Sequence, residues 1–333
     1  MSTTDAAPPL STPLVVGVDL GGTKMAAALV TADGALAGPL ASVPTPARSG
    51  PEAVLDAIAS VVDTVVSAGT HQAHGAPVAV SAVGVGSAGV VNVSTGTIVS
   101  ATDAITGWTG TLVATGVRSR LIAQGYGDMP VHVENDVDAY AGGEAWLGAG
   151  RDASSVLVVA VGTGVGGSVV INGTTVRGAH YVAGEIGHVP APGAENEMCT
   201  CGRRGHLEAI AAGPQIHRRY LAAGGDPEVA NAFEVEQRAD AGDPIASLVY
   251  RDSAIALGKV LAGVVAVLDP ERVVLSGGLA RAGELWWAPL RETFRAELID
   301  PLADVPLVRA ELGTNAPIIG AARGALRLLG ATA

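Results

Sequence analysis

The sequence is poor in cysteine and has no cluster of basic residues. Its 333 residues include only 2 cysteines, and 20 lysines and arginines stand against 32 aspartates and glutamates, which gives a formal net charge of −12. Nucleic acids and anionic membranes repel such a chain, so we expect neither as a partner. A disulfide within a Cys-x-Cys pair would be strained. The two thiols therefore indicate a reducing compartment, and we expect a cytoplasmic protein.

A long uninterrupted apolar run is also missing, although the mean hydropathy is +0.39. Residues 254–268 contain Lys259, and residues 78–91 are diluted by serine and glycine. Neither segment is expected to span a membrane. Residues 1–13 contain no lysine, arginine or apolar segment, so we expect a flexible tail and not a signal peptide.

Both cysteines lie in a short segment that is rich in metal-binding side chains. Two imidazoles and two thiolates can hold one tetrahedral zinc ion, and the intervening glycines allow the tight turns that such a loop needs. The four predicted ligands are His188, Cys199, Cys201 and His206. Four protein ligands leave no position for water, so the zinc would be structural. Glu185 and Glu208 bracket the loop and remain available for another ligand.

Strands and helices alternate along the chain, in an order that occurs twice. In the first half we predict strands at 14–19, 25–31, 35–43, 78–85, 97–100 and 131–134, a helix at 51–68 and a helix starting near Val137. In the second half we predict strands at 156–161, 168–171, 174–176 and 273–275 and a helix at about 244–268. This repetition indicates a duplicated α/β unit with a ligand cleft between the copies.

Three glycine clusters are candidates for phosphate binding. Asp19-Leu20-Gly21-Gly22-Thr23-Lys24 and the run Gly162–Gly167 each lie between two predicted strands, where backbone N–H groups can cradle phosphate. A simple tight turn is the alternative for the second run. Gly84-x-Gly86-x-x-Gly89 matches the dinucleotide-binding fingerprint as a string, but no helix is predicted after it, so we reject that function.

Glu134-Asn135-Asp136 lies where a predicted strand gives way to a helix. A carboxylate there can accept the proton of an attacking hydroxyl group, while Asn135 positions the substrate. The alternative is that Asn135 or Asp136 only caps the helix.

These motifs together resemble the ROK group of sugar kinases and repressors, which has the actin-like ATPase fold. The resemblance covers residues 14–330 and rests on DLGGTK, END, GTGVGG, GEIGH with its CxCGxxG loop, VVLSGG and GTNAPIIGAARGAL. It implies two actin-like (ribonuclease H-like) α/β domains with an interdomain cleft. The small domain would comprise residues 14–134 with about 315–333, and the larger domain residues 135–314, with the zinc loop at 188–206.

The resemblance also implies roles for individual residues. Asp136 is similar to the catalytic base of the family, and Asn135, Glu185, His188 and Glu208 are similar to its sugar-binding residues. The nucleotide-binding residues would be Asp19, Gly21, Gly22, Thr23, Lys24, Gly162, Thr163, Gly164, Gly166, Gly277 and Gly278. Members of this kind phosphorylate the 6-hydroxyl group of a hexose with ATP and magnesium, and Asp19 would lie nearest the metal. We expect an assembly of two or four copies.

Two departures from the family pattern bear on substrate and metal. His206 stands where the zinc loop usually has a third cysteine, and imidazole is also a zinc ligand. The usual Asn-Leu-Pro-Gly-Trp segment reads Asp103-Ala104-Ile105-Thr106-Gly107-Trp108, so a sugar-binding amide is missing. Either Asp103 replaces it or the substrate lacks the matching hydroxyl group.

We therefore expect a glucokinase-like enzyme, with N-acetylmannosamine, N-acetylglucosamine or another amino hexose as alternative substrates. Only about 15 residues precede the phosphate loop, too few for a DNA-binding domain. A sugar-sensing regulator without catalysis is the alternative of another class. An actin-like chaperone or filament protein is disfavoured by the zinc loop.

Overall fold

The computed structural model describes residues 13–72 and 78–330, and the chain divides into two compact units. Unit 1 comprises Met1–Tyr140 together with Pro317–Ala333, and unit 2 comprises Ala141–Ala316. The tail predicted over residues 1–13 lies outside the described residues, apart from Pro13. The chain thus passes between the units twice, in the third and in the last α-helix of the chain.

Unit 1 is built on a five-stranded sheet with the order β3-β2-β1-β4-β7. Its strands are β1 (Leu14–Leu20), β2 (Lys24–Val30), β3 (Ala41–Pro44), β4 (Val80–Ser87) and β7 (Val131–Asn135). The helices are α1 (Pro51–Gln72), α2 (Val113–Ala123), the start of α3 (Asp136–Leu147) and nearly all of α9 (Ala316–Leu328). A separate hairpin joins β5 (Val90–Asn92) to β6 (Thr97–Ser100). Strands β1, β4 and β7 are parallel, so their carboxyl ends share one edge of the sheet.

Helix α1 packs on the sheet through the apolar face that the sequence pattern predicted. It begins at Pro51, which has the backbone angle of a first helical turn, and Val54, Ile58, Val62 and Val65 are buried. Its window 51–70 is long and apolar enough to cross a membrane, but half of that window is buried inside the protein. The core of unit 1 therefore accounts for the hydropathy of α1.

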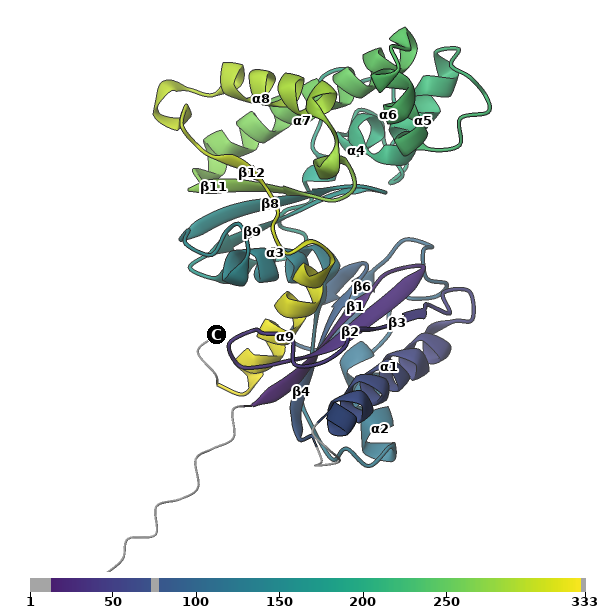
Figure 1. Ribbon diagram of the computed structural model, residues 1–333, viewed down its shortest axis with the longest axis vertical. Helices are drawn as coiled ribbons and strands as arrows, with labels where there is room; N and C mark the ends of the chain where they lie inside the picture. The colour runs from purple at the N-terminus through teal and green to yellow at the C-terminus, as the bar shows by residue number, and fades with distance from the viewer. Residues whose placement is uncertain (1–12, 73–77, 331–333) are drawn as a thin grey trace, which may run out of the picture. The chain divides into compact units, whose positions relative to one another are not determined.

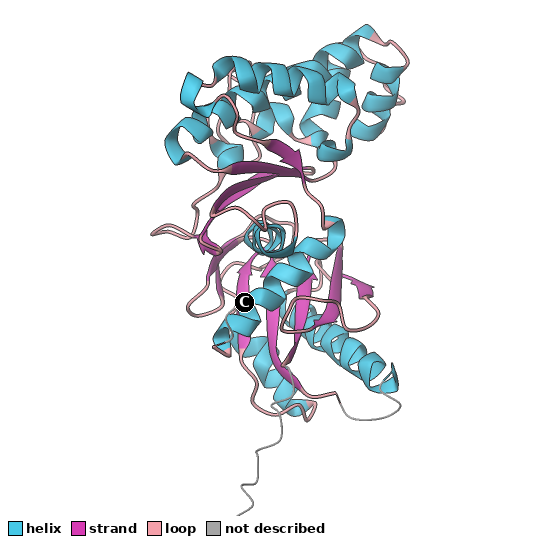
Figure 2. Cartoon of the chain, turned by 60° about the vertical axis from the view of Figure 1, so that its left-hand side comes forward, coloured by secondary structure: helices cyan, strands magenta, loops and turns pink. Residues whose placement is uncertain are grey.

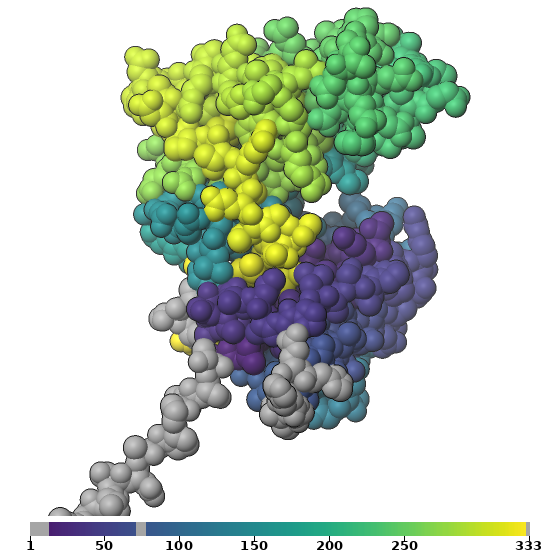
Figure 3. Space-filling view, viewed as in Figure 1, coloured from purple at the N-terminus to yellow at the C-terminus, as the bar shows by residue number. Residues whose placement is uncertain are grey.

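Helix α9 approaches the sheet of unit 1 unusually closely, because two paired strand positions are glycine. Gly17 of β1 and Gly84 of β4 are neighbours in the sheet. A Cβ atom at Gly17 would lie 2.0 Å from the carbonyl oxygen of Ile318, and one at Gly84 would lie 1.8 Å from that of Ala321. Figures 1 and 3 show the last helix beside the first strands. The two glycines thus let residues from opposite ends of the chain form one layer.

The third predicted strand, at 35–43, is wrong over most of its length. After the turn at Gly34 the chain makes a bridge between Val30 and Leu36, but β3 begins only at Ala41. Gly38 has a φ of 154° and Pro39 has no N–H group to donate, so a continuous ladder cannot form there. No helix opens after Gly89, as predicted, because the chain continues into β5.

Unit 2 is built on a second five-stranded sheet, with the order β10-β9-β8-β11-β12. Its strands are β8 (Ser155–Val161), β9 (Val165–Ile171), β10 (Thr174–Val176), β11 (Arg272–Ser276) and β12 (Leu307–Arg309). Its helices are α4 (Glu208–Ala211), α5 (Gly213–Ala222), α6 (Ala232–Asp240), α7 (Pro244–Leu268) and α8 (Glu284–Glu297). Short 3₁₀ turns occur at Ile186–His188, Leu279–Arg281, Asp300–Leu302 and Gly313–Asn315. The first two strands of each unit thus form an antiparallel hairpin with a glycine-containing turn.

Helix α7 is the central helix of unit 2, and the helices of this unit gather on one face of its sheet (Figure 2). The Asp243 side chain caps the helix by accepting hydrogen bonds from the N–H groups of Ile245 and Ala246, at 2.8 and 3.0 Å. The helix ends at Asp269, which is left-handed with a φ of 45°. The boundaries agree with those predicted. Helices α2, α4, α5, α6, α8 and α9 were not predicted.

Candidate functional site

The first glycine cluster forms the turn of the β1–β2 hairpin in unit 1. The Gly21 N–H group donates to the Lys24 carbonyl oxygen at 3.1 Å. Thr45 braces the turn from outside, because its hydroxyl group donates to the Gly21 carbonyl at 2.7 Å and its N–H group donates to that of Thr23 at 3.0 Å. A strand follows the turn, as predicted, so it is not a Walker loop.

Two carboxylates lie at the shared carboxyl ends of the parallel strands in unit 1. In the sheet register, Asp19 of β1 pairs with Gly86 of β4, and Gly86 pairs with Glu134 of β7. Asp136 follows Glu134 by two residues in the chain. Burial, and then the charge of Asp136, raise the pKa of Asp19 to about 6, while Lys24 opposes the shift. The pair thus concentrates negative charge, which a divalent cation would neutralise.

Asn135 holds the start of α3, as the alternative interpretation proposed. Its side-chain oxygen accepts hydrogen bonds from the N–H groups of Val137 and Asp138, at 2.8 and 3.2 Å. Its amide nitrogen donates to the Gly89 carbonyl at 2.9 Å. An amide NH₂ group has two hydrogens, so this capping is compatible with a further contact to a substrate.

Residues 103–108, which lack the asparagine that is usual in the family, lie beside the turn of the β1–β2 hairpin. A Cβ atom at Gly22 would be 3.4 Å from the Cβ atom of Ala104. The segment is anchored by Trp108, whose buried indole donates a 3.1 Å hydrogen bond to the hydroxyl group of Ser87. Asp103 is exposed, so its carboxylate is accessible to a ligand.

The second glycine cluster forms the turn of the β8–β9 hairpin in unit 2. The Gly162 N–H group donates to the Gly164 carbonyl at 2.9 Å, and its carbonyl accepts from Gly213 at 2.8 Å. Gly277 follows β11 with a φ of 87°, and a Cβ atom there would lie 2.3 Å from the Val161 carbonyl oxygen. The sequence Ser276-Gly277-Gly278 can therefore approach the hairpin only because it has glycine at this position.

A hollow of about 820 Å³ opens beside the second hairpin, entirely within unit 2. Its volume is within the range of small-ligand sites. Gly162, Thr163 and Gly278 line one side. Sequence analysis did not find the other walls, which come from α5, α6, α7 and the turn after β11 and include His217, Phe233, Glu236, Tyr250 and Arg281. These residues belong to no motif and are scattered over 65 positions, from 217 to 281, so no spacing signal could have found them.

The four predicted zinc ligands lie together in unit 2. One nitrogen or sulfur atom of each lies within 4.8 Å of those of the others. Nδ1 of His188 is 3.6 Å from Sγ of Cys199, and Nδ1 of His206 is 3.2 Å from Sγ of Cys201. Ligand atoms of a tetrahedral zinc site with usual bond lengths are separated by about 3.3–3.8 Å. His206, in place of the third cysteine, thus lies at a distance from Cys201 that is close to the spacing a zinc ion requires.

Glu208 connects the metal loop to the second hairpin. One carboxylate oxygen accepts a hydrogen bond from the Val165 N–H group at 3.1 Å. The other accepts from the Thr200 hydroxyl group and lies 3.7 Å from the Cys199 sulfur. A Cβ atom at Gly164 would be only 2.9 Å from this carboxylate. Thr200, which sequence analysis did not single out, therefore helps to orient Glu208.

Glu185 and His188 lie on one turn beside the metal ligands. With Nδ1 of His188 turned toward Cys199, its Nε2 atom is 3.9 Å from the Glu185 carboxylate. Burial raises the pKa of Glu185, with His188 opposing and Glu208 adding to the shift. A metal ion bound by Nδ1 of His188 would therefore also orient the ring toward Glu185.

The predicted site residues are divided between the two units. In unit 1 lie Asp19, Gly21, Gly22, Thr23, Lys24, Asp103, Asn135 and Asp136. In unit 2 lie Gly162, Thr163, Gly164, Gly166, Glu185, His188, Cys199, Cys201, His206, Glu208, Gly277 and Gly278.

Comparison with known proteins gives consistent matches over nearly the whole chain. The model of the ROK family matches residues 15–327. A glucokinase of Streptomyces coelicolor is 34% identical over 328 residues, which cover 93% of this chain and 96% of that protein. An N-acetylmannosamine kinase of Escherichia fergusonii is 33% identical over 308 residues, which cover 92% of this chain and 96% of that protein.

Solved structures of ROK family proteins are also similar to this chain. A ROK hexokinase from Thermus thermophilus has a TM-score of 0.82 and 34% identity, and the match covers 95% of this chain and 99% of that one. A ROK family glucokinase from Streptomyces griseus, in complex with glucose and AMPPNP, has a TM-score of 0.74 and 31% identity, with 93% and 98% covered.

Proposed function

Because the chain belongs to the ROK family, we propose that it is an ATP-dependent kinase that phosphorylates the 6-hydroxyl group of a hexose, with glucose as the default substrate. The observation that carries this proposal is the pair of carboxylates at the strand ends of unit 1. Asp19 and Asp136 are close enough for the charge of one to raise the pKa of the other. Kinases need both a cation-binding carboxylate and a proton acceptor.

Asp136 acts as the general base in this proposal. It takes the proton of the 6-hydroxyl group as that oxygen bonds to the γ-phosphorus atom and the bond from phosphorus to the bridging oxygen breaks, which releases ADP. The N–H groups of the β1–β2 hairpin, with Lys24, stabilise the charge on the transferring group. The magnesium ion that accompanies ATP would supply further charge neutralisation. Asp19 is the residue that would hold the ion, because the Asp19 carboxylate is buried beside Asp136. Of the causes of the Asp19 pKa shift, only the charge of Lys24 lowers that pKa.

The hollow beside the second hairpin supports a nucleotide as phosphoryl donor. Phosphate alone needs backbone N–H groups and cations, whereas this hollow also presents the Phe233 ring, which is 65% exposed, and the Glu236 carboxylate. An aromatic ring suits a purine base, and a carboxylate accepts hydrogen bonds from ribose hydroxyl groups. Polyphosphate offers neither group, so we infer that it does not replace ATP well.

We further propose that one structural zinc ion is bound by His188, Cys199, Cys201 and His206. The spacing of the four ligand atoms supports the metal, and the remaining nitrogen of His188 is left to face the sugar with Glu185. Both cysteines are free, which suits a reducing compartment, and we infer a cytoplasmic location.

The sugar itself is the open part of the proposal. Glu185 and Glu208 give unit 2 two carboxylate acceptors, and Asp103, in the place of the missing asparagine, gives unit 1 another. Carboxylates bind hydroxyl groups but gain more from an ammonium group, because charge-assisted hydrogen bonds are roughly twice as strong as neutral ones. We therefore propose measurable turnover of an amino hexose beside glucose. N-acetylmannosamine is the second candidate, since a kinase of that sugar is 33% identical to this chain.

An assay of ADP release tests the proposal directly. Glucose, mannose, N-acetylglucosamine, N-acetylmannosamine and 3-amino-3-deoxyglucose are supplied in turn with ATP and magnesium, and the product is checked for phosphate at position 6. We expect the highest kcat/KM with glucose. Binding of a sugar with no ADP release from any of them would refute catalysis and favour a sugar-sensing regulator.

A further inference from the structure

Helix α6 contributes two chemically different side chains to the hollow of about 820 Å³ beside the second hairpin. Phe233 and Glu236 are three residues apart, so they lie on one face of the helix. Val235 and Ala239 are buried in the core of unit 2 and fix the helix there. The hollow thus receives an aromatic ring and a carboxylate from one packed helix.

Hydrogen bonds hold the start of α6 in place. The Asn231 side chain accepts from the Glu234 N–H group at 3.1 Å, and the Glu234 carboxylate accepts from the Ala230 N–H group at 2.8 Å. In the loop before them, the Val229 carbonyl oxygen lies 2.7 Å from Nε2 of His217, a residue of α5 that also lines the hollow. A carbonyl only accepts, so His217 donates. The face of α6 that lines the hollow is therefore fixed relative to α5.

The Glu236 carboxylate is held by groups from two neighbouring helices. Its Oε1 atom accepts a hydrogen bond from the N–H group of Gly283, at the start of α8, at 3.3 Å. Tyr250 of α7 is buried and lines the hollow. Burial, the charge of Glu236 and a hydrogen bond to that carboxylate raise the pKa of Tyr250, so its hydroxyl group keeps the proton and remains a donor. A carboxylate accepts about four hydrogen bonds, so these contacts leave acceptor capacity for a ligand.

We propose that Glu236 binds the adjacent hydroxyl groups of the ribose of the phosphoryl donor, and that Tyr250 positions the carboxylate for this contact. The donor is then a ribonucleoside triphosphate, and a deoxyribonucleoside triphosphate replaces it poorly. Tyr250 is a positioning residue, because it acts on the nucleotide through Glu236. The inference rests on the proposed function, in which this hollow holds the nucleotide.

The chemistry of a held carboxylate suits this role. The 2′- and 3′-hydroxyl groups of a ribose are adjacent, and the two oxygen atoms of a carboxylate accept from both, in bonds that are stronger than those between neutral groups. Because Gly283 and Tyr250 already orient Glu236, binding costs little further side-chain entropy. A site built for a hydroxyl group rejects an analogue without it, because the acceptor is left unpaired.

The arrangement along α6 favours the ribose over the base as the partner of Glu236. One helical turn, about 5 Å, separates Phe233 from Glu236. A nucleobase and its ribose are neighbouring rings joined by a single bond. A base that stacks on Phe233 therefore places its ribose beside Glu236, and the adenine amino group, on the far side of the base, points away.

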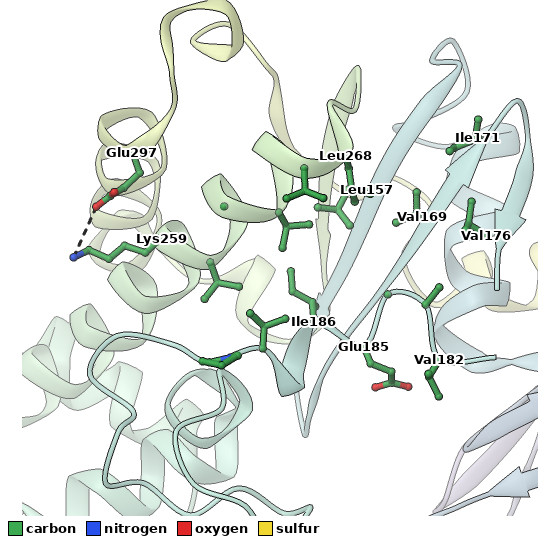
Figure 4. Close-up of a pocket in the computed structure, with 18 of the residues that line it drawn as sticks. Leu157, Val169, Ile171, Val176, Val182, Glu185, Ile186, Lys259, Leu268 and Glu297 are labelled. Carbon is green, nitrogen blue, oxygen red and sulfur yellow. Dashed lines mark ion pairs between the residues drawn. The ribbon is translucent and has the colours of Figure 1, made fainter. Parts of the chain in front are cut away.

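Another hollow of unit 2, of about 830 Å³, has different chemistry (Figure 4). Apolar side chains form most of its walls, among them Val169, Ile171 and Leu268. Lys259 and Glu297 lie at one end and pair with each other at 3.8 Å. Apolar walls suit neither a triphosphate nor a ribose, so we place the nucleotide in the hollow beside the second hairpin.

Matched donors test the ribose contact in the full-length protein. ATP, 2′-deoxyATP and 3′-deoxyATP are compared by the rate at which phosphorylated hexose forms with magnesium present. We expect kcat/KM for ATP to exceed that for each deoxy donor by at least about tenfold. Glu236→Gln should reduce this ratio to below about threefold, because an amide has one acceptor oxygen where the carboxylate has two.

Tyr250→Phe removes only the hydroxyl group that positions the carboxylate. We expect the ratio of ATP to deoxy donors to fall by about threefold, with KM for the hexose unchanged. Tyr220→Phe is the matched control, because Tyr220 is also a buried tyrosine of unit 2 whose hydroxyl group donates to a carboxylate, that of Asp243, at 2.9 Å. Tyr220 does not line the hollow, so its variant should keep the wild-type ratio. Circular dichroism of each variant confirms its folding.

Equal use of ATP and the deoxy donors by the wild type would overturn the ribose contact, and so would an unchanged ratio in Glu236→Gln. An equal fall in the two tyrosine variants would remove the positioning role of Tyr250. ITP lacks the amino group of adenine but keeps the ribose. A changed preference between ATP and ITP in Glu236→Gln, without a change toward the deoxy donors, would assign Glu236 to the base instead.

Calorimetry distinguishes failure of this inference from failure of the proposed function. ADP and 2′-deoxyADP are titrated into the wild type and into Glu236→Gln. A wild type that forms no phosphorylated hexose but binds ADP more tightly than 2′-deoxyADP would refute the kinase function and leave the ribose contact intact. Turnover with equal affinity for the two nucleotides would overturn the contact and leave the kinase function intact.

Discussion

Replacement of Asp19 by asparagine should stabilise the ligand-free protein. Burial, and then the charge of Asp136, raise the pKa of Asp19 from 3.8 to about 6. A carboxyl group with a raised pKa holds its proton more tightly in the folded state, so stability is present at low pH and is lost as the pH rises through about 6. The difference between the two values is about 2.2, which corresponds to about 3 kcal/mol at 1.36 kcal/mol for each pKa unit.

Asparagine keeps the shape of the side chain and carries no charge to bury. We therefore expect the free energy of unfolding to rise by about 3 kcal/mol at about pH 8 and by about half as much at about pH 5, where Asp19 is already mostly protonated. Urea denaturation without nucleotide or magnesium measures both values. Asp33→Asn is the control, because Asp33 is exposed, and a hydrogen bond from the Thr31 hydroxyl lowers its pKa, so its replacement should bring no gain.

Two results would refute this reasoning about Asp19. One is the absence of any gain at about pH 8, and the other is an equal gain at both pH values. A second measurement connects the charge to its proposed use: magnesium and ATP together should raise the denaturation midpoint of the wild type but not that of Asp19→Asn.

Substitutions at four further residues test other parts of the site. Asp136→Asn should lower kcat by about 10²–10⁴-fold with little change in sugar binding, and near-normal turnover would show that Asp136 is not the base. Elemental analysis of the wild type should find about one zinc ion per chain, and a wild type without zinc would contradict the metal site. Cys199→Ser should lose this zinc and should weaken sugar affinity more than ATP affinity. Thr200→Val should keep the zinc but raise KM for the hexose by about tenfold, because Glu208 loses a hydroxyl donor, and Thr200→Ser should restore it. Asp103→Ala should reduce kcat/KM for an amino hexose more than for glucose, whereas equal losses would assign Asp103 a structural role.

Most of what the sequence predicted correctly depends on residues that are close together in the chain. Both hairpins were predicted because a glycine-rich turn lies between two apolar runs. Helix α7 was predicted with its boundaries, because Asp243, Pro244 and Pro270 mark its ends and apolar residues fill the space between them. The proximity of the four predicted zinc ligands was predicted for the same reason, since they lie within 19 positions, from 188 to 206, with glycine between them.

The predictions failed where the local signal was weak or contradictory. The run at 35–43 contains apolar residues, but Gly38 and Pro39 prevent pairing until Ala41. Helix α2 has apolar residues with almost no helical periodicity, and only the burial of Val113, Val117 and Leu121 shows which face packs inward. Contacts with the rest of the fold stabilise such a helix.

The tertiary structure alone decided how distant residues combine. The pKa of Asp19 rises because folding buries it near Asp136, which lies 117 positions away in the chain. The hollow beside the second hairpin is formed by elements from different parts of unit 2. Turns, caps and metal loops follow from the chemistry of neighbouring residues. Whether a side chain is buried or exposed depends on which helices and strands pack over it, and no spacing of residues in the sequence specifies that packing.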